Sequence, residues 1–146
     1  MENLTGSDFN DLLAGSATAN AIDGGAGNDV ILGRGGADWL TGGLGDDTFV
    51  FAATSDSLPS AQDVITDFSF GDKIDLSAID ADIGTAGNQA FSMNHHAGNA
   101  GDVFLNYDAQ VDRTFVSLYV DNSGHAAAIF QMLGDHSLMT ASDFIL

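Results

Sequence analysis

Aspartate residues recur every nine positions in the first third of the chain, and this spacing could build metal sites. Residues 24–32, 33–41 and 42–50 each place glycine first, aspartate sixth and a large apolar residue eighth. The sixth residues are Asp29, Asp38 and Asp47, and the same phase reaches Asp11, Asn20 and Asp56. A glycine-rich turn can point carbonyl oxygens inward beside each carboxylate. Such an all-oxygen ligand set suits a hard cation, calcium above all.

Short turns and short strands are the elements that would position these carboxylates. Glycine reaches positive φ without steric cost, so the first six residues of each block can turn tightly. The last three are extended, and only the eighth of them points inward. The inward residues form one predicted ladder over residues 4–58: Leu4, Leu13, Ile22, Ile31, Leu40, Phe49 and Leu58. A flexible acidic linker would not keep an apolar residue in phase, and a metal-free solenoid would leave its stacked aspartates repelling one another.

This pattern resembles the calcium-binding nonapeptide repeat of RTX proteins. The resemblance implies a right-handed parallel β-roll in which two nonapeptides make one coil and calcium lies between turns on the same side. One side would then stack Asp11, Asp29 and Asp47, and the other Asn20, Asp38 and Asp56. The carbonyl ligands that it implies belong to Ser7, Phe9, Gly24, Gly25, Ala26, Gly27, Gly33, Arg34, Gly35, Gly36, Gly42, Gly43, Leu44 and Gly45. About three to five ions are expected.

Two residues depart from the repeat pattern. Arg34 replaces a glycine, which affects the shape of its turn. Asn20 replaces an aspartate, so a site that uses it carries one charge fewer and should bind calcium more weakly.

The charge balance of the whole chain agrees with bound cations. The 146 residues carry a formal net charge of −18, with only Arg34, Lys73 and Arg113 opposing 21 acidic residues. Such an excess destabilises a compact state by self-repulsion, which calcium would relieve. It also argues against nucleic acid and anionic membranes as partners, since both attract basic residues. No segment is long and apolar enough for membrane insertion. The chain has no cysteine, so metal rather than disulfides would stabilise a modest single-domain core.

Residues 59–146 change character, because glycine thins out and alternating apolar strands separated by turns appear. The pattern predicts strands at residues 63–68 and 71–77 and, after them, near residues 102–107, 114–120 and 127–133, with turns between them as in antiparallel hairpins. We therefore expect an all-β fold, with a β-roll over residues 4–58 followed by an antiparallel, β-sandwich-like cap over residues 59–146. Residues 47–51, 63–68 and 71–77 are similar to the C-terminal domain of serralysin-type metalloproteases. In that family the aspartates matching Asp56, Asp63 and Asp72 also bind calcium.

The last four residues carry a further signal. Asp143, Phe144, Ile145 and Leu146 place one acidic residue before three apolar ones. This ending resembles the terminal motif by which type I exporters read their substrates, and the motif could equally form an edge strand. The start of the chain shows neither the basic region nor the apolar run of a signal peptide. The expected location is therefore extracellular, after export through a type I exporter.

No catalytic constellation is visible. His95, His96, His125 and His136 form no His-Glu-x-x-His motif and are interpreted as loop or surface residues. The predicted function is a non-catalytic module for calcium-dependent folding and type I secretion, attached to an upstream catalytic domain. The alternative is a carbohydrate-binding accessory module, as in mannuronan C-5 epimerases. Trp39 occupies an outward position and could stack on a sugar, but the charge of −18 suits a neutral glycan better than a polyanionic one.

Overall fold

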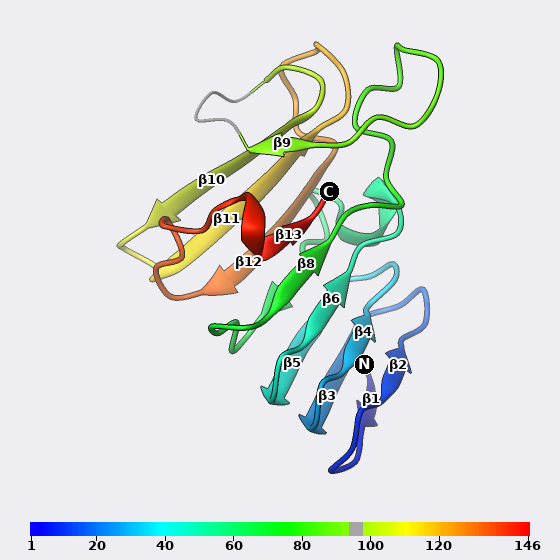
Figure 1. The fold of residues 1–146 in the computed structure, drawn as a ribbon, viewed down its shortest axis with the longest axis vertical. Coiled ribbons are helices and arrows are strands. Elements are labelled where there is room, and N and C mark those ends of the chain that lie inside the picture. The colour runs from blue at the N-terminus through cyan, green and yellow to red at the C-terminus, as the bar shows by residue number, and fades with distance from the viewer. Residues whose placement is uncertain (94–97) are drawn as a thin grey trace.

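Two β-sheets make up the described part of the molecule. The computed structural model describes residues 1–93 and 98–146, and Figure 1 shows their arrangement. The eight-stranded sheet has the order β1 (Glu2–Thr5), β3 (Asn20–Ala26), β5 (Trp39–Leu44), β7 (Val64–Ile65), β12 (Ala128–Leu133), β11 (Arg113–Tyr119), β10 (Asp102–Asp108) and β9 (Ser92–Met93). The five-stranded sheet has the order β13 (Phe144–Ile145), β8 (Lys73–Asp75), β6 (Thr48–Val50), β4 (Val30–Leu32) and β2 (Leu12–Ala14). The short 3-10 turns η1 (Thr54–Ser57) and η2 (Ala141–Asp143) complete the described elements.

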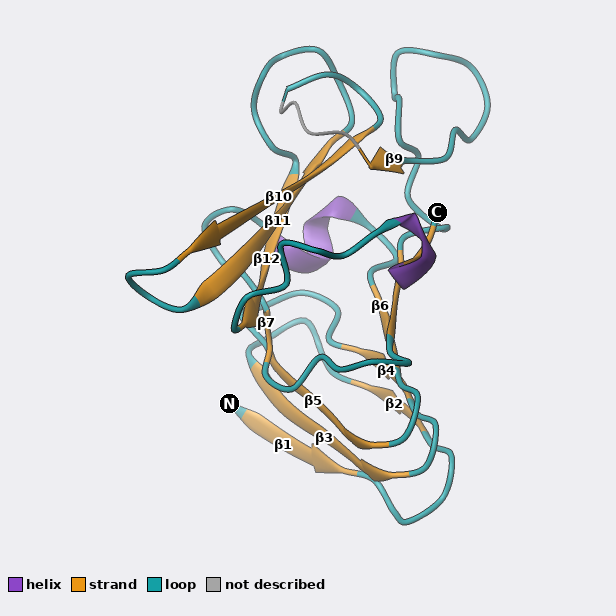
Figure 2. Cartoon of the chain, turned by 60° about the vertical axis from the view of Figure 1, so that its left-hand side comes forward, coloured by secondary structure: helices purple, strands orange, loops and turns teal. Residues whose placement is uncertain are grey.

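The first six strands wind as a parallel roll. Consecutive strands alternate between the two sheets, so that β1, β3 and β5 face β2, β4 and β6 (Figure 2). Strands of neighbouring coils pair in parallel at a spacing of 18 residues, as in the pairs Ile22 with Leu40 and Ile31 with Phe49. These four apolar residues are buried between the sheets. The predicted roll of two nonapeptides per coil is therefore confirmed.

The antiparallel part is also present. β10 pairs with β11, and β11 with β12, in antiparallel ladders close to the predicted ranges. Three further strands differ from the expected cap, because β7, β8 and β13 join the parallel sheets of the roll. β7 pairs with β5 on one side and β12 on the other, and so connects the roll to the antiparallel strands.

The predicted ladder was wrong at Leu58, which is 43% exposed. Ile65 takes its place opposite Leu40, and Ile74 lies opposite Phe49. Each pair is separated by 25 residues instead of 18, because η1 and the turn after it lengthen the coil. Leu4 does pair in register with Ile22, but it lies in the edge strand β1 and stays 36% exposed.

One apolar core runs from the roll into the antiparallel region. Phe51, just after the roll, stacks on Phe130 of β12 with ring centroids 4.3 Å apart. Ser57 is buried at the same junction, where its hydroxyl donates to the carbonyl of Ile129 and accepts from the N–H of Asp63, both at 2.8 Å. Among the residues described, no helix has the length and apolar character needed to span a bilayer.

Candidate metal centre

The sixth residues of the repeats stack in two columns along the roll. In the first column, the backbone N–H of Asp11 donates to Asp29 Oδ1, that of Asp29 to Asp47 Oδ1, and that of Asp47 to Asp72 Oδ1, at 2.8–2.9 Å. In the second, the N–H of Asn20 donates to Asp38 Oδ1 at 2.7 Å and that of Asp38 to Asp63 Oδ1 at 2.9 Å. One oxygen of each accepting carboxylate is therefore hydrogen-bonded to the backbone of the preceding coil.

The second oxygen of four column carboxylates has no hydrogen-bond partner. These buried atoms are the Oδ2 oxygens of Asp29, Asp38, Asp47 and Asp63. Leaving an anionic oxygen buried and unpaired is costly, because it loses its hydration without gaining a compensating contact. The four oxygens fall into two neighbouring pairs, one in each column. A cation beside each pair would supply the missing partner.

Burial raises the pKa of three of these carboxyl groups, those of Asp63, Asp38 and Asp47. Burial raises the pKa of Asp63 to about 8, and the charges of Asp38 and Asp56 add to the increase. Burial likewise raises the pKa of Asp38 to about 6, with a further contribution from Asp56. The pKa of Asp47 is raised by burial and, in addition, by the charges of Asp72 and Asp29. Without a cation, these three carboxyl groups therefore hold their protons more tightly than an exposed aspartate does.

The first glycine of a repeat leaves space for these oxygens. A methyl group added to Gly24 would collide with Asp29 Oδ2 and with the carbonyl oxygen of Gly42. A methyl group on Gly42 would in turn collide with Asp47 Oδ2. A carboxylate oxygen and a carbonyl oxygen thus approach the same point from neighbouring coils. Glycine is required there because any side chain would fill this cradle.

The other predicted carbonyl ligands lie in stacked turns. Gly25 packs against the carbonyl of Ser7, and Gly43 against that of Gly25. Gly27 packs in the same way against Phe9, and Gly45 against the carbonyl of Gly27. The carbonyls of Ser7 and Leu44 also accept backbone hydrogen bonds, from Ala26 and Gly27, and each keeps a second lone pair. β3 and β5 extend through Ala26 and Leu44, so these turns are partly strand.

The turn over residues 33–36 belongs to the second column. A methyl group on Gly33 would meet Asp38 Oδ2, and Gly36 packs against Thr18 in the preceding coil. Arg34 adopts a φ of 65°, the left-handed conformation that glycine tolerates best. The turn therefore keeps the repeat's backbone shape despite the arginine.

Asp56 does not occupy the column position predicted for it. Its Oδ2 accepts hydrogen bonds from the N–H groups of Ala52 and Ala53, whereas Asp63 pairs with Asp38. The reason is the lengthened coil, which moves the next column residue seven positions along. Asp56 remains close enough for its charge to raise the pKa of both Asp38 and Asp63. At this end of the second column, the carboxyl groups of Asp38, Asp63 and Asp56 are therefore neighbours.

Three predicted ligands have oxygens that are already satisfied. Asn20 Oδ1 accepts from the N–H of Ser16, and its amide nitrogen donates to Ser16 Oγ and Glu2 Oε2. Asp11 Oδ2 accepts from the N–H and the hydroxyl of Ser7, and these hydrogen bonds lower the pKa of Asp11. Asp72 Oδ2 accepts from the N–H of Ser69. These residues therefore have less need of a cation than the four with an unpaired oxygen.

Two acidic residues of this region were missed by the sequence analysis. Glu2 pairs in register with Asn20 and so continues the second column. Counting nine residues back from Asp11 would have found it at a sixth position. Asp67 accepts hydrogen bonds from the N–H groups of Gly42 and Gly43 at 2.9 and 2.8 Å. Asp67 thus satisfies two backbone N–H groups of the last repeat. Its position does not follow the nine-residue period, so the repeat pattern could not have identified it.

The C-terminal residues are built into the fold. Phe144 is buried in the core and pairs with Ile74, while Leu146 packs against the same core. Asp143 belongs to η2, where its carboxylate accepts from the N–H of Thr140 at 2.7 Å. The proposed export motif therefore also forms the edge strand β13.

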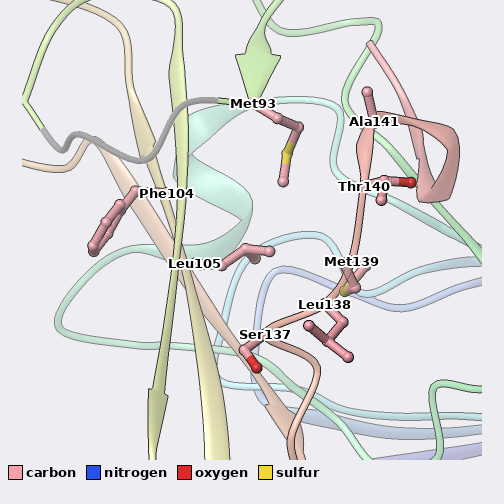
Figure 3. Close-up of a pocket in the computed structure, with 8 residues that line it drawn as sticks. All are labelled: Met93, Phe104, Leu105, Ser137, Leu138, Met139, Thr140 and Ala141. Atoms are coloured by element: carbon pink, nitrogen blue, oxygen red, sulfur yellow. The ribbon is translucent and has the colours of Figure 1, made fainter.

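An apolar hollow of about 440 Å³ lies elsewhere, between β10 and the segment before η2 (Figure 3). It is lined by Met93, Phe104, Leu105, Ser137, Leu138, Met139, Thr140 and Ala141. These side chains include no titratable group that could act as an acid, base or nucleophile at neutral pH.

No three His, Asp or Glu side chains of the described residues converge as a metal site. The candidate centre has a different composition, because it combines only two column carboxylates with backbone carbonyl oxygens. His95 and His96 lie outside the described residues.

The chain is similar to a known protein family and to several of its members. The family model described as Peptidase M10 serralysin C terminal matches residues 5–146. Metallopeptidase AprA of Pseudomonas marginalis is 53% identical over 131 residues, which cover 89% of this chain and 26% of that protein. Serralysin G of Dickeya chrysanthemi is 44% identical over 147 residues, which cover 100% of this chain and 30% of that protein. The chain thus spans less than a third of these relatives.

A solved structure is also similar. It is the solution structure of the AlgE6R2 subunit from the Azotobacter vinelandii mannuronan C5-epimerase. The TM-score is 0.61 at 27% identity, over 99% of this chain and 92% of that one. The combination of roll and antiparallel strands therefore occurs in both proteins.

Proposed function

Because the chain belongs to the family of Peptidase M10 serralysin C-terminal domains, we propose that it is a calcium-dependent folding and export module of a larger extracellular protein. The family is the C-terminal part of serralysin metallopeptidases and not their catalytic domain. The single observation that carries the calcium proposal is the set of four buried carboxylate oxygens without a partner.

Two calcium positions have the strongest support. One would be held by Asp29 and Asp47 together with turn carbonyls such as that of Gly42. The other would be held by Asp38 and Asp63, with Asp56 nearby. Calcium prefers six to eight oxygen ligands and accepts irregular geometry, which suits carboxylates mixed with carbonyls. Positions at Asn20, Asp11 and Asp72 would bind more weakly, because those side chains already have hydrogen-bond partners.

Calcium binding at two such positions would decide whether the chain folds. A ligand that binds only the folded state adds about 2.7 kcal/mol per site when its free concentration is about 100 times the dissociation constant. Two sites would add roughly 5 kcal/mol, which is within the usual range of domain stability. At low calcium, self-repulsion at a net charge of −18 would favour the unfolded chain. Bound calcium would therefore act as a folding switch between compartments.

The position of the export motif fits the same switch. Phe144 is buried and paired in β13, so an exporter could read the motif only while the chain is unfolded. Low calcium inside the cell would keep the motif accessible, and calcium outside would fold it into the sheet. The proposal includes export through a type I exporter and attachment to an upstream catalytic domain, since the chain spans only 26% and 30% of the longer relatives that it matches.

Calcium titration of the purified chain tests the proposal. We expect far-UV circular dichroism in EGTA to show an unfolded chain and added calcium to restore β-structure, while magnesium acts far more weakly. Native mass spectrometry should count at least two ions. Asp47→Asn and Asp63→Asn should each raise the calcium needed for folding, whereas Asp108→Asn, outside both columns, should leave it unchanged. A chain that is folded in EGTA with the same melting temperature as in calcium would refute the switch.

A further inference from the structure

The outer face of the eight-stranded sheet carries a row of side chains that the carboxylate columns do not use. Strand registers align Ala21, Trp39, Val64, Gln131, Phe115 and Asn106 across six neighbouring strands. We call these six residues the Trp39 row. Their chain neighbours Leu40, Ile65, Met132 and Val116 are buried in the core. Because side chains alternate along a strand, the Trp39 row faces away from the core.

The Trp39 row combines ring surfaces with fixed polar groups. Trp39 is 44% exposed. It lies opposite Val64 in the neighbouring strand, and it helps to bury that residue. Between the two aromatic residues lies the amide of Gln131. Its nitrogen donates to Gln62 Oε1 at 2.7 Å, and its oxygen accepts from Arg113 Nη1 at 2.5 Å. A half-exposed indole and an oriented amide therefore lie on the same open surface.

A shallow hollow of about 260 Å³ borders the indole. Its lining includes Trp39, Thr41, Thr66, Asp23, Asn3 and Thr5. The hydroxyl groups of Thr41 and Thr66 lie 2.8 Å apart. Hydroxyl, amide and carboxylate groups thus surround one side of the ring, and each can bond to a hydroxyl of a ligand.

We propose that the Trp39 row binds a neutral glycan that lies across the strands. The C–H face of a sugar ring packs on an indole through dispersion and burial of apolar area, while its hydroxyl groups need polar partners at the edge. None of the six residues of the Trp39 row is ionised, and of the charged groups beside it the guanidinium of Arg113 is already bonded to Gln131 while Asp23 is an anion. The net charge of −18 also repels polyanions. Both features select an uncharged ligand.

The spacing of the rings selects a polymer over a single sugar. Trp39 in β5 and Phe115 in β11 are separated by β7 and β12, which makes three steps or about 14 Å across the sheet. One sugar ring cannot reach both aromatic residues.

Intrinsic fluorescence gives a direct test, because Trp39 is the only tryptophan. In saturating calcium, the chain would be titrated with cello-, xylo-, manno- and malto-hexaose, and with polymannuronate as the charged ligand. At least one neutral oligosaccharide should shift the emission and reduce quenching by acrylamide, and polymannuronate should not. Absence of binding by every neutral oligosaccharide would overturn the proposal, as would preferential binding of polymannuronate.

Variants locate the site. By calorimetry, Trp39→Ala and Phe115→Ala should each weaken binding about tenfold or more, and Trp39→Phe should weaken it less. Phe70→Ala is the matched control, because Phe70 is a fully exposed aromatic residue in the turn before β8. Equal binding by Trp39→Ala and the unchanged chain would overturn the proposal. Circular dichroism in calcium shows whether a variant binds glycan less well only because it no longer folds. Trp39→Phe should fold at the same calcium concentration as the unchanged chain, so the test of glycan binding is separate from the test of the folding switch.

Discussion

The backbone N–H of Asp38 donates a 2.9 Å hydrogen bond to Oδ1 of Asp63, a residue 25 positions further along the chain. This bond carries the second carboxylate column past the point where the nine-residue period ends. It also leaves Oδ2 of Asp63 buried and unpaired, as it is in Asp38. The two residues therefore define a candidate calcium position at the junction of the roll and the antiparallel strands.

Asp63 should matter more for calcium than Asp56, although both are aspartates near the same turn. Asp63→Asn removes a buried charge with an unpaired oxygen, so the calcium needed for half-folding should rise about tenfold or more. Asp56→Asn should have a smaller effect, because Asp56 Oδ2 is bonded to Ala52 and Ala53. Calcium titrations followed by circular dichroism compare the two variants. An equal or larger effect of Asp56→Asn would contradict the assignment.

The apolar ladder predicts a contrast between Ile65 and Leu58. Ile65 is fully buried opposite Leu40, so Ile65→Ala should cost about 2 to 5 kcal/mol in the free energy of unfolding. Leu58 is 43% exposed, and Leu58→Ala should cost less than about 1 kcal/mol. Urea unfolding in saturating calcium measures both values. Similar losses would mean that Leu58 belongs to the core.

Two repeat glycines should respond differently to alanine. A methyl group on Gly42 would collide with Asp47 Oδ2, so Gly42→Ala should destabilise the calcium-bound fold by about 1 to 3 kcal/mol and weaken calcium binding. At Gly35 the nearest atom would be 3.8 Å away, which is ordinary contact. Gly35→Ala should therefore be neutral or slightly stabilising, by restricting the unfolded chain. Equal destabilisation of both variants by urea would argue against a cradle at Gly42.

The calcium-free chain should fold more readily at acidic pH. The pKa values of Asp63 and Asp38 are raised in the folded state to about 8 and about 6, from an ordinary 3.8. The folded state therefore binds these protons more tightly, and their contribution to stability is complete near pH 4 and is lost as pH rises through 6 and 8. In EGTA, the folded fraction seen by circular dichroism should increase from pH 8 to pH 5.

Calcium affinity should change with pH in the opposite direction, because calcium binds ionised carboxylates. Its affinity should fall over the window in which the calcium-free fold gains stability. Asp63→Asn should flatten the pH profile in EGTA, and Asp108→Asn should not. A folded fraction that decreases between pH 8 and pH 5 would contradict the assigned directions.

Phe144 should be needed for folding as well as for any export signal. It is buried and pairs with Ile74, so Phe144→Ala should cost about 3 to 5 kcal/mol in calcium. Ile145 is 41% exposed, and Ile145→Ala should cost about 1 kcal/mol or less. Thermal and urea unfolding measure the difference. Full stability after removal of residues 143–146 would show that the C-terminal strand is dispensable.

The antiparallel strands could be predicted from the sequence, because their apolar residues alternate and their turns are short. β10, β11 and β12 lie within two residues of the predicted ranges. β7 and β8 lie within the expected strands at residues 63–68 and 71–77, but their parallel pairing could not be assigned in the same way. Short apolar runs such as residues 64–65 fit either kind of sheet, and only their neighbours decide between parallel and antiparallel pairing.

The sequence by itself determined the coil: glycine where the backbone must turn, aspartate where oxygens gather, and an apolar residue where the chain points inward. Each choice is local, so it repeats visibly every nine residues. Only the tertiary structure decided where the coil ends and that Asp63 and Asp72, instead of Asp56, complete the columns. A loop of seven more residues outside the ladder costs little closure entropy. Residues can therefore be neighbours in space across a gap that leaves no period to count.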